Sequence, residues 1–246
     1  MPGSPRDSPL DQSLPRGRHG YPLEEVVAYQ RVRLLDAFVA EVHCRGFPDT
    51  TVARVCARAG TSTKTFYGAF DSKDECLLRA FEAGAAVVCG HGALAYRRAQ
   101  GPWPVRATEA LRTMLRILGD NPAFARLAFV ELPRLGPVGM AQLDAVAAHC
   151  LRQLEGHWPR AVPAGLAPEV YLGALVAATV RLLADHTMAG RADQLADLTE
   201  TLADWMAAWW AGSAGSAGSG HEDAGAGVGE GHRPTTRATA TAPATA

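Results

Sequence analysis

The sequence predicts an all-α protein, and three observations support this fold class. Apolar residues recur at helical spacing along most of the chain of 246 residues. Proline residues stand at the starts of several of these segments, where their fixed φ and missing N–H suit the first helical turn. Strand signals are nearly absent, because the chain holds no alternating β-branched run and no Asn-Gly turn.

Both ends of the chain are expected to lie outside the folded part. Residues 1–20 are polar and rich in Pro and Gly, which predicts a disordered N-terminal arm. Residues 212–246 repeat Ser-Ala-Gly and then Thr-Ala-Pro, which predicts a disordered low-complexity tail. The helices are therefore expected between these two segments.

The first two helices are predicted from their apolar spacing and their end signals. They end at Gly46 and Gly60, because glycine readily adopts the left-handed conformation that terminates a helix. Either Thr50 or Thr51 can cap the start of the second helix. The apolar residues of these helices are Leu34, Leu35, Phe38, Val39 and Val42, and then Val52, Val55, Cys56 and Ala59.

The next two helices are predicted from capping residues and two aromatic positions. Ser62 can cap a short third helix, in which Phe66 and Phe70 lie one turn apart. Ser72 and Glu75 have the spacing of a capping box, in which each side chain accepts from a free amide of the other residue. A long fourth helix is expected to start there.

The fourth helix is expected to run toward Arg98, and five further helices follow it. They are predicted at residues 103–119, 122–134, 137–157, 168–189 and 192–210. Several of their starts are marked by proline: Pro102, Pro104, Pro122, Pro137 and Pro168.

Residues 50–73 hold two short helices joined by a tight turn that contains glycine, which is the pattern of a helix-turn-helix. On the second helix Phe66 and Phe70 face inward, and the outward positions are Thr63, Lys64, Thr65 and Tyr67. Small polar side chains and a lysine at a helix N-terminus can reach base edges in the major groove of DNA. The segment therefore predicts DNA binding.

Lys64 and Lys73 are the only lysines in the chain, and both lie in this segment. Lys73 falls in the first turn of the fourth helix, where a cation opposes the helix dipole at a cost of roughly 0.3–1 kcal/mol. This placement favours a partner with negative charge, such as a DNA phosphate. The alternative is a solvated lysine without a role.

The segment from about Gln30 to Ala80 resembles the tetracycline-repressor (TetR) family of transcriptional regulators. The most specific part is the Thr-Phe-Tyr-x-x-Phe-x-x-Lys run from Thr65 to Lys73. Residues 21–27 also look like the start of family members that carry an N-terminal extension. The other matching positions are Gly46, Phe47, Thr50, Thr51, Val52, Ala59, Gly60, Ser62, Ser72 and Asp74.

The resemblance implies a helix-turn-helix DNA-binding domain at residues 21–80 and a helical effector-binding and dimerisation domain at residues 81–211. The third helix would enter the major groove of double-stranded DNA, with Thr63, Lys64 and Thr65 at base edges. The residues expected at phosphates are Thr51, Ser62, Tyr67 and Lys73.

Two features lie beyond this match. Gly68 and Ala69 occupy sites where the family often has large aromatic or His residues, and Gly68 is expected to loosen the recognition helix slightly. Arg16 and Arg18 form an Arg-Gly-Arg element that resembles arms lying in an AT-rich minor groove. The alternative for this element is an ordinary solvated tail.

Residues 81–211 contain no motif that names a function. The resemblance implies that the last two helices pair with those of a second subunit in a homodimer. Small residues allow close helix approach, and tryptophans are typical of interface hot spots; the alternative is that the tryptophans pack in the core of their own subunit. The residues expected at the interface are Gly173, Ala177, Trp205 and Trp209.

A small-molecule effector is expected to enter the second domain. Aromatic and Met side chains at helical spacing can line such a pocket, although side chains of this kind more often form plain core. The residues expected at the pocket are Met114, Phe124, Leu127 and Met140, with Phe129 and Trp158 in the same set.

Composition predicts a soluble cytoplasmic protein without a cofactor or a metal. The longest strongly apolar stretch, residues 170–180, is shorter than the about 20 residues of a membrane span. The N-terminus has no apolar signal-peptide region. Five cysteines at irregular spacing, without a CxxC pair, argue against a disulfide framework and for a reducing compartment. The adjacent His149 and Cys150 have no second pair at ligand spacing.

The combined expectation is a dimeric, sequence-specific transcriptional regulator, a repressor that an effector releases from a palindromic operator. An enzyme is not expected, because the chain contains no G-x-S-x-G, H-E-x-x-H, Walker or dinucleotide-binding motif. The alternative is a helical interaction protein of the same fold that has lost DNA binding, for which Gly68 and Ala69 are the support.

Overall fold

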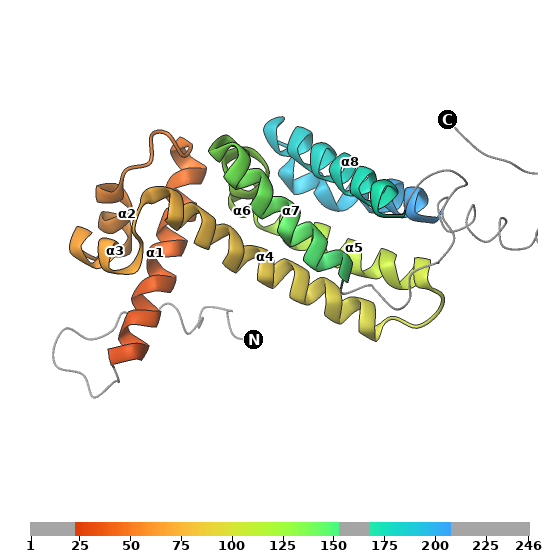
Figure 1. Ribbon diagram of the computed structural model, residues 1–246, viewed down its shortest axis with the longest axis horizontal. Helices are drawn as coiled ribbons and strands as arrows, with labels where there is room; N and C mark the ends of the chain where they lie inside the picture. The colour runs from red at the N-terminus through yellow and green to blue at the C-terminus, as the bar shows by residue number, and fades with distance from the viewer. Residues whose placement is uncertain (1–22, 153–167, 208–246) are drawn as a thin grey trace, which may run out of the picture.

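The computed structural model describes residues 23–152 and 168–207, and the regular elements in these two ranges are all helical, as the sequence predicts. A small three-helix part lies at one end of the molecule and a larger helical bundle extends away from it (Figure 1). The three-helix part, called the reading head below, consists of α1 (Leu23–Arg45), α2 (Val52–Ala59) and α3 (Thr63–Ala69).

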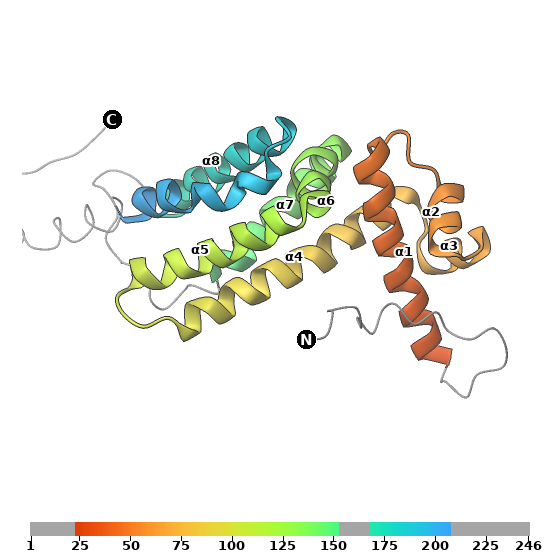
Figure 2. The same ribbon diagram turned by 180° about the vertical axis from the view of Figure 1, so that it is seen from behind.

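Helix α4 (Lys73–Arg98) connects the reading head to the bundle. It runs the length of the bundle, and α5 (Trp103–Asp120) returns beside it (Figure 2). Among the described helices, α4 alone is long and apolar enough to cross a membrane. Its buried residues pack against α1, α5 and α7, so the apolar composition serves the protein core.

The segment predicted as one helix at residues 122–134 is instead three short elements. They are α6 (Pro122–Arg126), a π-helical turn η2 (Leu127–Glu131) and a 3-10 turn η3 (Leu132–Leu135). The amide of Leu132 donates to the carbonyl of Leu127, five residues earlier. Pro133 has no N–H to continue regular α-helical bonding, which explains why the helix changes register here.

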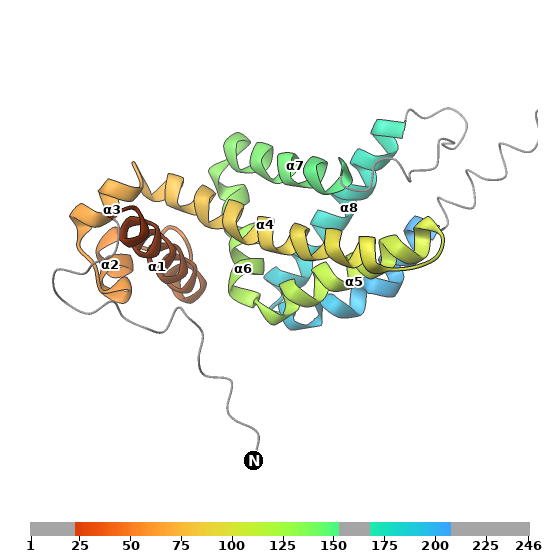
Figure 3. The ribbon, with the colours of Figure 1, turned by 90° about the horizontal axis from the view of Figure 1, so that it is seen from below.

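Three later elements complete the bundle: α7 (Pro137–Arg152), α8 (Pro168–Met188) and η4 (Ala192–Leu198). Helical structure continues from η4 through residues 199–207. Figure 3 shows α7 alongside α4, and α8 contacts both η2 and η4. The predicted ends of the helices at residues 157 and 210 lie outside the described residues.

The main core joins the reading head to the bundle. Phe38, Phe66 and Phe70 are fully buried between the helices of the reading head, and Leu77 on α4 belongs to the same cluster as Leu127 on η2. Burial of each such side chain contributes roughly 1.5–3 kcal/mol. The reading head is therefore packed against α4 and the η2 turn rather than tethered by a linker.

Candidate nucleic-acid interface and adjoining cavity

The cap of α2 is Thr51, one of the two residues that the sequence allowed. The Thr51 hydroxyl accepts a hydrogen bond from the amide of Arg54 at 3.4 Å. Thr50 is buried, and its hydroxyl donates to the carbonyl of Gly46 at 2.8 Å. Gly60 ends the helix with φ +62°, a left-handed conformation that favours glycine. The two threonines therefore fix the loop and the start of α2.

Helix α3 presents polar residues on one face and aromatic residues on the other. The Ser62 hydroxyl accepts from the amide of Thr65 at 3.1 Å and caps the helix as predicted. Phe66 and Phe70 point into the core, whereas the side chain of Tyr67 is 59% exposed. The residues predicted to face DNA share this outer surface: Ser62, Thr63, Lys64 and Tyr67 are exposed, and Thr65 is half-buried.

Lys73 has a set of contacts that the sequence analysis did not anticipate. Its ammonium group donates to the carbonyls of Phe47 at 2.9 Å, Thr50 at 3.1 Å and Pro48 at 3.4 Å. It also lies 4.3 Å from the centroid of the Phe47 ring. A cation in the first turn of α4 opposes the helix dipole, and the partial negative charges of these carbonyls offset that cost. They also engage the three donors of the ammonium group. The predicted phosphate contact of Lys73 is untested, and because these carbonyls engage its donors we expect Lys73 to contribute little to phosphate binding.

The start of α4 differs in one detail from the predicted capping box. The Ser72 hydroxyl accepts from the amide of Glu75 at 3.0 Å, as expected. The Glu75 carboxylate, however, accepts from the amide of Asp71 at 2.6 Å, one residue before the cap. This hydrogen bond lowers the pKa of Glu75.

A buried carboxylate ties α1 to α2. Glu41 accepts from Arg58 at 2.7 Å and from Arg45 at 3.3 Å, and its residue is only 7% exposed. The hydrogen bond from Arg58 is the main reason that the pKa of Glu41 lies below its ordinary value. The contact sets the position of the helix-turn-helix relative to α1.

Sequence reasoning missed one cation on the exposed side of the helix-turn-helix. Arg54 lies on α2, three residues after the cap Thr51, and its side chain is exposed with one donor on the carbonyl of Asp49 at 3.5 Å. Residues three positions apart lie on the same face of a helix, so the spacing of Arg54 from Thr51 was the signal in the sequence that both lie on the exposed side. The arm residues Arg16 and Arg18 lie outside the described residues.

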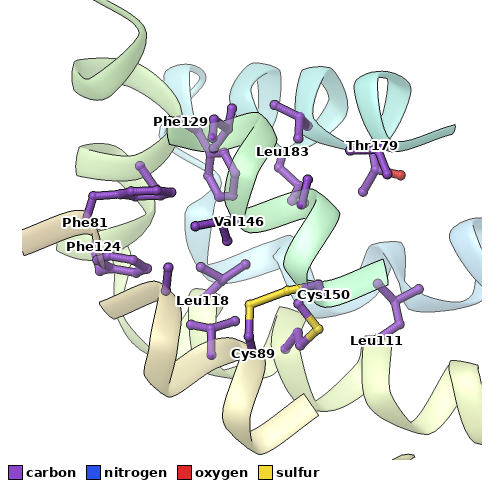
Figure 4. A pocket seen from close by; sticks show the side chains of 18 of the residues that line it. Phe81, Cys89, Leu111, Leu118, Phe124, Phe129, Val146, Cys150, Thr179 and Leu183 are labelled. Atoms are coloured by element: carbon purple, nitrogen blue, oxygen red, sulfur yellow. A yellow bond between two sulfur atoms is a disulfide. The ribbon is translucent and has the colours of Figure 1, made fainter. Parts of the chain in front are cut away.

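A cavity of about 240 Å³ lies inside the bundle. The chain surrounds it with side chains from α4, α5, α6, α7 and α8 (Figure 4). Its described lining is apolar apart from the Thr179 hydroxyl and contains no charged side chain. The lining residues are Phe81, Ala85, Val88, Cys89, Leu111, Met114, Leu118, Phe124, Ala128, Phe129, Leu143, Val146, Ala147, Cys150, Val176, Thr179, Val180, Leu183, Leu202 and Met206.

Some of the residues predicted for the pocket line this cavity and others do not. Met114 and Phe124 line the cavity, as does Phe129. Leu127 does not, because its side chain is fully buried in the main core. Met140 does not either, because it lies on the outer side of α7 and is 42% exposed. Trp158 lies outside the described residues.

The cavity wall depends on a glycine where α4 passes α6. A Cβ atom on Gly84 would overlap a ring carbon of Phe124. The Phe124 ring stacks on Phe81 with centroids 6.3 Å apart (Figure 4). Gly84 therefore makes room for one aromatic wall of the cavity.

The sequence argued against a disulfide framework, and it did not indicate the one disulfide that the structure contains among the described cysteines. Cys89 on α4 and Cys150 on α7 are bonded across the cavity wall, 61 residues apart in sequence (Figure 4). Their Cα atoms are 6.0 Å apart, within the usual range for a disulfide. Cys44, Cys56 and Cys76 are free thiols, and burial raises the pKa of the latter two. The part of the chain that the structure describes contains no cluster of three or more His, Cys, Asp or Glu side chains that could hold a metal.

The residues predicted for a dimer interface are exposed where the structure describes them. Gly173 and Ala177 on α8 are exposed, and Trp205 is 41% exposed. Tryptophan is enriched among the residues that dominate protein interfaces. Trp209 lies outside the described residues.

Residues 34–80 match the family described as bacterial regulatory proteins, tetR family. A comparison with curated protein sequences gives no match. Many solved structures share the fold, and two of them are named FadR: a fatty acid degradation regulator from Bacillus halodurans and a transcriptional regulator from Bacillus subtilis. The one from Bacillus halodurans is 14% identical, with a TM-score of 0.61 over 71% of this chain and 93% of that chain.

The second FadR structure comes from Bacillus subtilis and is described as a complex with stearoyl-CoA. It is 14% identical, with a TM-score of 0.61 over 70% of this chain and 95% of that chain. A TetR family transcription regulator from Marinobacter aquaeolei VT8 is 20% identical, with a TM-score of 0.53 over 73% of this chain and 98% of that chain. These likenesses extend the shared fold beyond the reading head to the helical bundle.

Proposed function

Residues 34–80 belong to the tetR family of bacterial regulatory proteins, and from this premise we propose that the chain is a sequence-specific repressor that a small molecule releases from DNA. The observation that carries the proposal is the outer face of α3. Ser62, Thr63, Lys64 and Tyr67 share this exposed face, whose opposite side is anchored by fully buried Phe66. A rigid helix with small polar side chains outward suits the major groove.

Each residue of this face has a proposed role. Thr63, Lys64 and Thr65 meet base edges, because they occupy the first turn of the helix that enters the groove. Thr51, Ser62 and Tyr67 meet phosphates and fix the register of the protein on the duplex. Arg16 and Arg18 of the arm add minor-groove contacts.

Two copies of the chain bind a palindromic operator in this proposal. The exposed faces of α8 and residues 199–207, with Gly173, Ala177 and Trp205, form the interface between them. A symmetric dimer presents two recognition helices at a fixed separation, so the operator must contain two half-sites at that spacing.

The chemistry of the cavity narrows the class of effector. Its described lining contains no charge and one hydroxyl, that of Thr179. Burial of an unpaired charge in such an environment is strongly unfavourable. We therefore assign the cavity to an apolar group, such as an aliphatic acyl chain whose polar head remains outside. The FadR complex with stearoyl-CoA supplies a first probe of this kind.

The remaining assignments follow from the proposed role. A regulator of this family acts on DNA by binding and is generally not an enzyme, and we assign it to the cytoplasm together with the DNA it reads. The alternative of an interaction protein without DNA binding rests on Gly68 and Ala69. A Cβ atom on Gly68 would meet nothing within 4 Å, so this position leaves the face of α3 open rather than blocked.

The test is selection of bound sequences from random duplex DNA by the purified full chain at moderate salt. Enrichment of a palindrome, followed by its release upon addition of stearoyl-CoA, supports the proposal. Failure to enrich any sequence, with the protein shown to be folded and dimeric, would favour the interaction protein instead.

A further inference from the structure

The side chain of Glu131 joins the cavity-bearing bundle to the reading head. Glu131 ends the π-helical turn η2 and is fully buried. Its carboxylate accepts a hydrogen bond from the amide of Phe47 at 3.3 Å, across 84 residues of sequence. Arg126 lies 3.0 Å from one carboxylate oxygen and Arg134 lies 3.3 Å from the other. A buried carboxylate is tolerated only with partners of this kind.

The amide that donates this hydrogen bond lies in the loop directly before the helix-turn-helix. Phe47 lies in the loop between α1 and α2, directly after Gly46, whose left-handed φ of +81° turns the chain there. The carbonyl of Phe47 accepts from the Lys73 ammonium group at 2.9 Å and from the amide of Thr50 at 3.3 Å. Thr50 precedes the cap of α2. A displacement of Phe47 is therefore transmitted directly to the start of α2.

The segment that carries Glu131, α6 and η2, also forms part of the cavity wall. Phe124, Ala128 and Phe129 line the cavity and lie within seven residues of Glu131 along α6 and η2. Turns of π-helix inside α-helices occur frequently at functional sites. A group that enters the cavity and moves Phe129 moves the turn that carries Glu131.

From these contacts we propose that Glu131 is the positioning residue that couples occupation of the cavity to the placement of the helix-turn-helix. The inference rests on the proposed function, in which an effector in the cavity controls DNA binding. With the cavity empty, the carboxylate holds Phe47 in place for DNA binding. With the cavity occupied, the η2 turn shifts and this contact is lost.

The first test measures the coupling between the two sites. The dissociation constant of the full chain for its selected DNA is measured with and without stearoyl-CoA, and that of stearoyl-CoA is measured without DNA. The coupling ratio is the dissociation constant for DNA with the probe divided by that without it. We expect this ratio to be on the order of ten or more in the natural protein. Glu131→Met removes the acceptor, and we expect it to bind the probe normally while the coupling ratio falls toward one. Glu131→Gln keeps an acceptor and should restore part of the ratio.

Glu41→Met is the matched control. Glu41 is also a buried carboxylate between two arginines, Arg45 and Arg58, but it joins two helices within the reading head. Its loss should weaken DNA binding equally with and without the probe, and so leave the coupling ratio at the natural value. An unchanged ratio in Glu131→Met, or an equal fall in both variants, would overturn the proposal. A natural protein that binds neither DNA nor the probe would instead count against the proposed function.

A second test needs no effector and covers the case in which Glu131→Met does not fold. Gly84→Ala places a Cβ atom on the ring of Phe124 and forces that side chain to move. We expect faster hydrogen exchange at the Phe47 amide and DNA binding weakened several-fold, without any probe. In the control Gly90→Ala, on the same helix, the new Cβ atom meets nothing within 4 Å, so both quantities should stay unchanged. Unchanged exchange at Phe47 in Gly84→Ala would contradict the coupling.

Discussion

The ammonium group of Lys73 lies 2.9 Å from the carbonyl oxygen of Phe47 and 4.3 Å from the centroid of its ring. A single side chain at the start of α4 thus holds both the backbone and the aromatic ring of the α1–α2 loop. The loop, in turn, precedes the helix-turn-helix. The stability of the reading head should therefore depend on this lysine even when no DNA is bound.

The first prediction concerns this clamp. Lys73→Met keeps an unbranched side chain, one atom shorter, but removes the donors to three carbonyls, and we expect the free energy of unfolding to fall by about 1–3 kcal/mol. Lys64→Met is the matched control, because Lys64 is exposed and should change stability by less than about 0.5 kcal/mol. Urea denaturation of the full chain measures both.

The same variant tests the predicted phosphate contact. A lysine that neutralises a phosphate contributes about one to the slope of log K against log salt. Because the donors of Lys73 are engaged by carbonyls, we expect the slope in Lys73→Met to match that of the natural protein. A slope smaller by about one, with unchanged stability, would assign Lys73 to the phosphate instead.

The second prediction separates base contacts from backbone contacts on α3. Lys64→Ala should relax sequence preference at one position of each half-site, at a cost of about 1–3 kcal/mol on the preferred sequence. Tyr67→Phe removes only an exposed hydroxyl, while the ring keeps its edge contact with Phe66 at 5.4 Å. We expect it to weaken binding about equally on selected and random duplex. Fluorescence anisotropy on both kinds of DNA measures the difference; parallel losses for the two variants would contradict these roles.

Local features of the fold were predictable from the sequence, whereas contacts between distant segments were not. The caps Thr51, Ser62 and Ser72 and the inward Phe66 follow from spacing over three or four residues, and the structure has all of them. Nothing in the sequence distinguishes Glu131 from the other charged residues of the helices. Its contact with Phe47 depends on how α1 packs against η2, which no local pattern encodes.

The cavity shows the same division. Aromatic and Met residues at helical spacing indicated its wall, and Phe124 is there. Helical spacing alone does not separate the cavity side of this segment from the core side, so it also assigned Leu127, which is fully buried in the main core, to the cavity. The pairing of Cys89 with Cys150 depends on α4 and α7 lying side by side, which cysteine counting cannot reveal.

The third prediction concerns pH. Contacts with arginines lower the pKa of Glu41 in the folded protein, so its contribution to stability is complete above the ordinary value of 4.5 and is lost as pH falls through the lower folded value. The stability difference between the natural protein and Glu41→Gln should therefore be largest at neutral pH and shrink in acid. Urea denaturation at a series of pH values measures it. A difference that stays constant into acid would show that the charge of Glu41 does not stabilise the fold.

The fourth prediction concerns the cysteines. With Cys89 bonded to Cys150, the denatured, unreduced protein should titrate as three thiols, those of Cys44, Cys56 and Cys76. The native protein should react rapidly at Cys44 alone, because Cys56 and Cys76 are buried and their pKa values are raised. In Cys150→Ser the denatured, unreduced protein should gain one thiol, that of Cys89. The disulfide is absent from the purified protein if the natural chain shows all five thiols before reduction.

The fifth prediction concerns the proposed dimer. Trp205 is 41% exposed beside α8, whose Gly173 and Ala177 are also exposed, so this face leaves apolar surface for a partner. Trp205→Glu places a charge in the proposed interface. We expect the dissociation constant of the dimer to rise at least about tenfold, since hot-spot residues contribute about 2 kcal/mol or more. Val87→Glu, at an exposed position on α4, is the control and should leave association unchanged. Sedimentation equilibrium measures both variants.

Because two recognition helices must bind together, Trp205→Glu should also weaken binding to a palindrome far more than to a single half-site. Equal losses on the two DNAs would argue that Trp205 lies outside the interface.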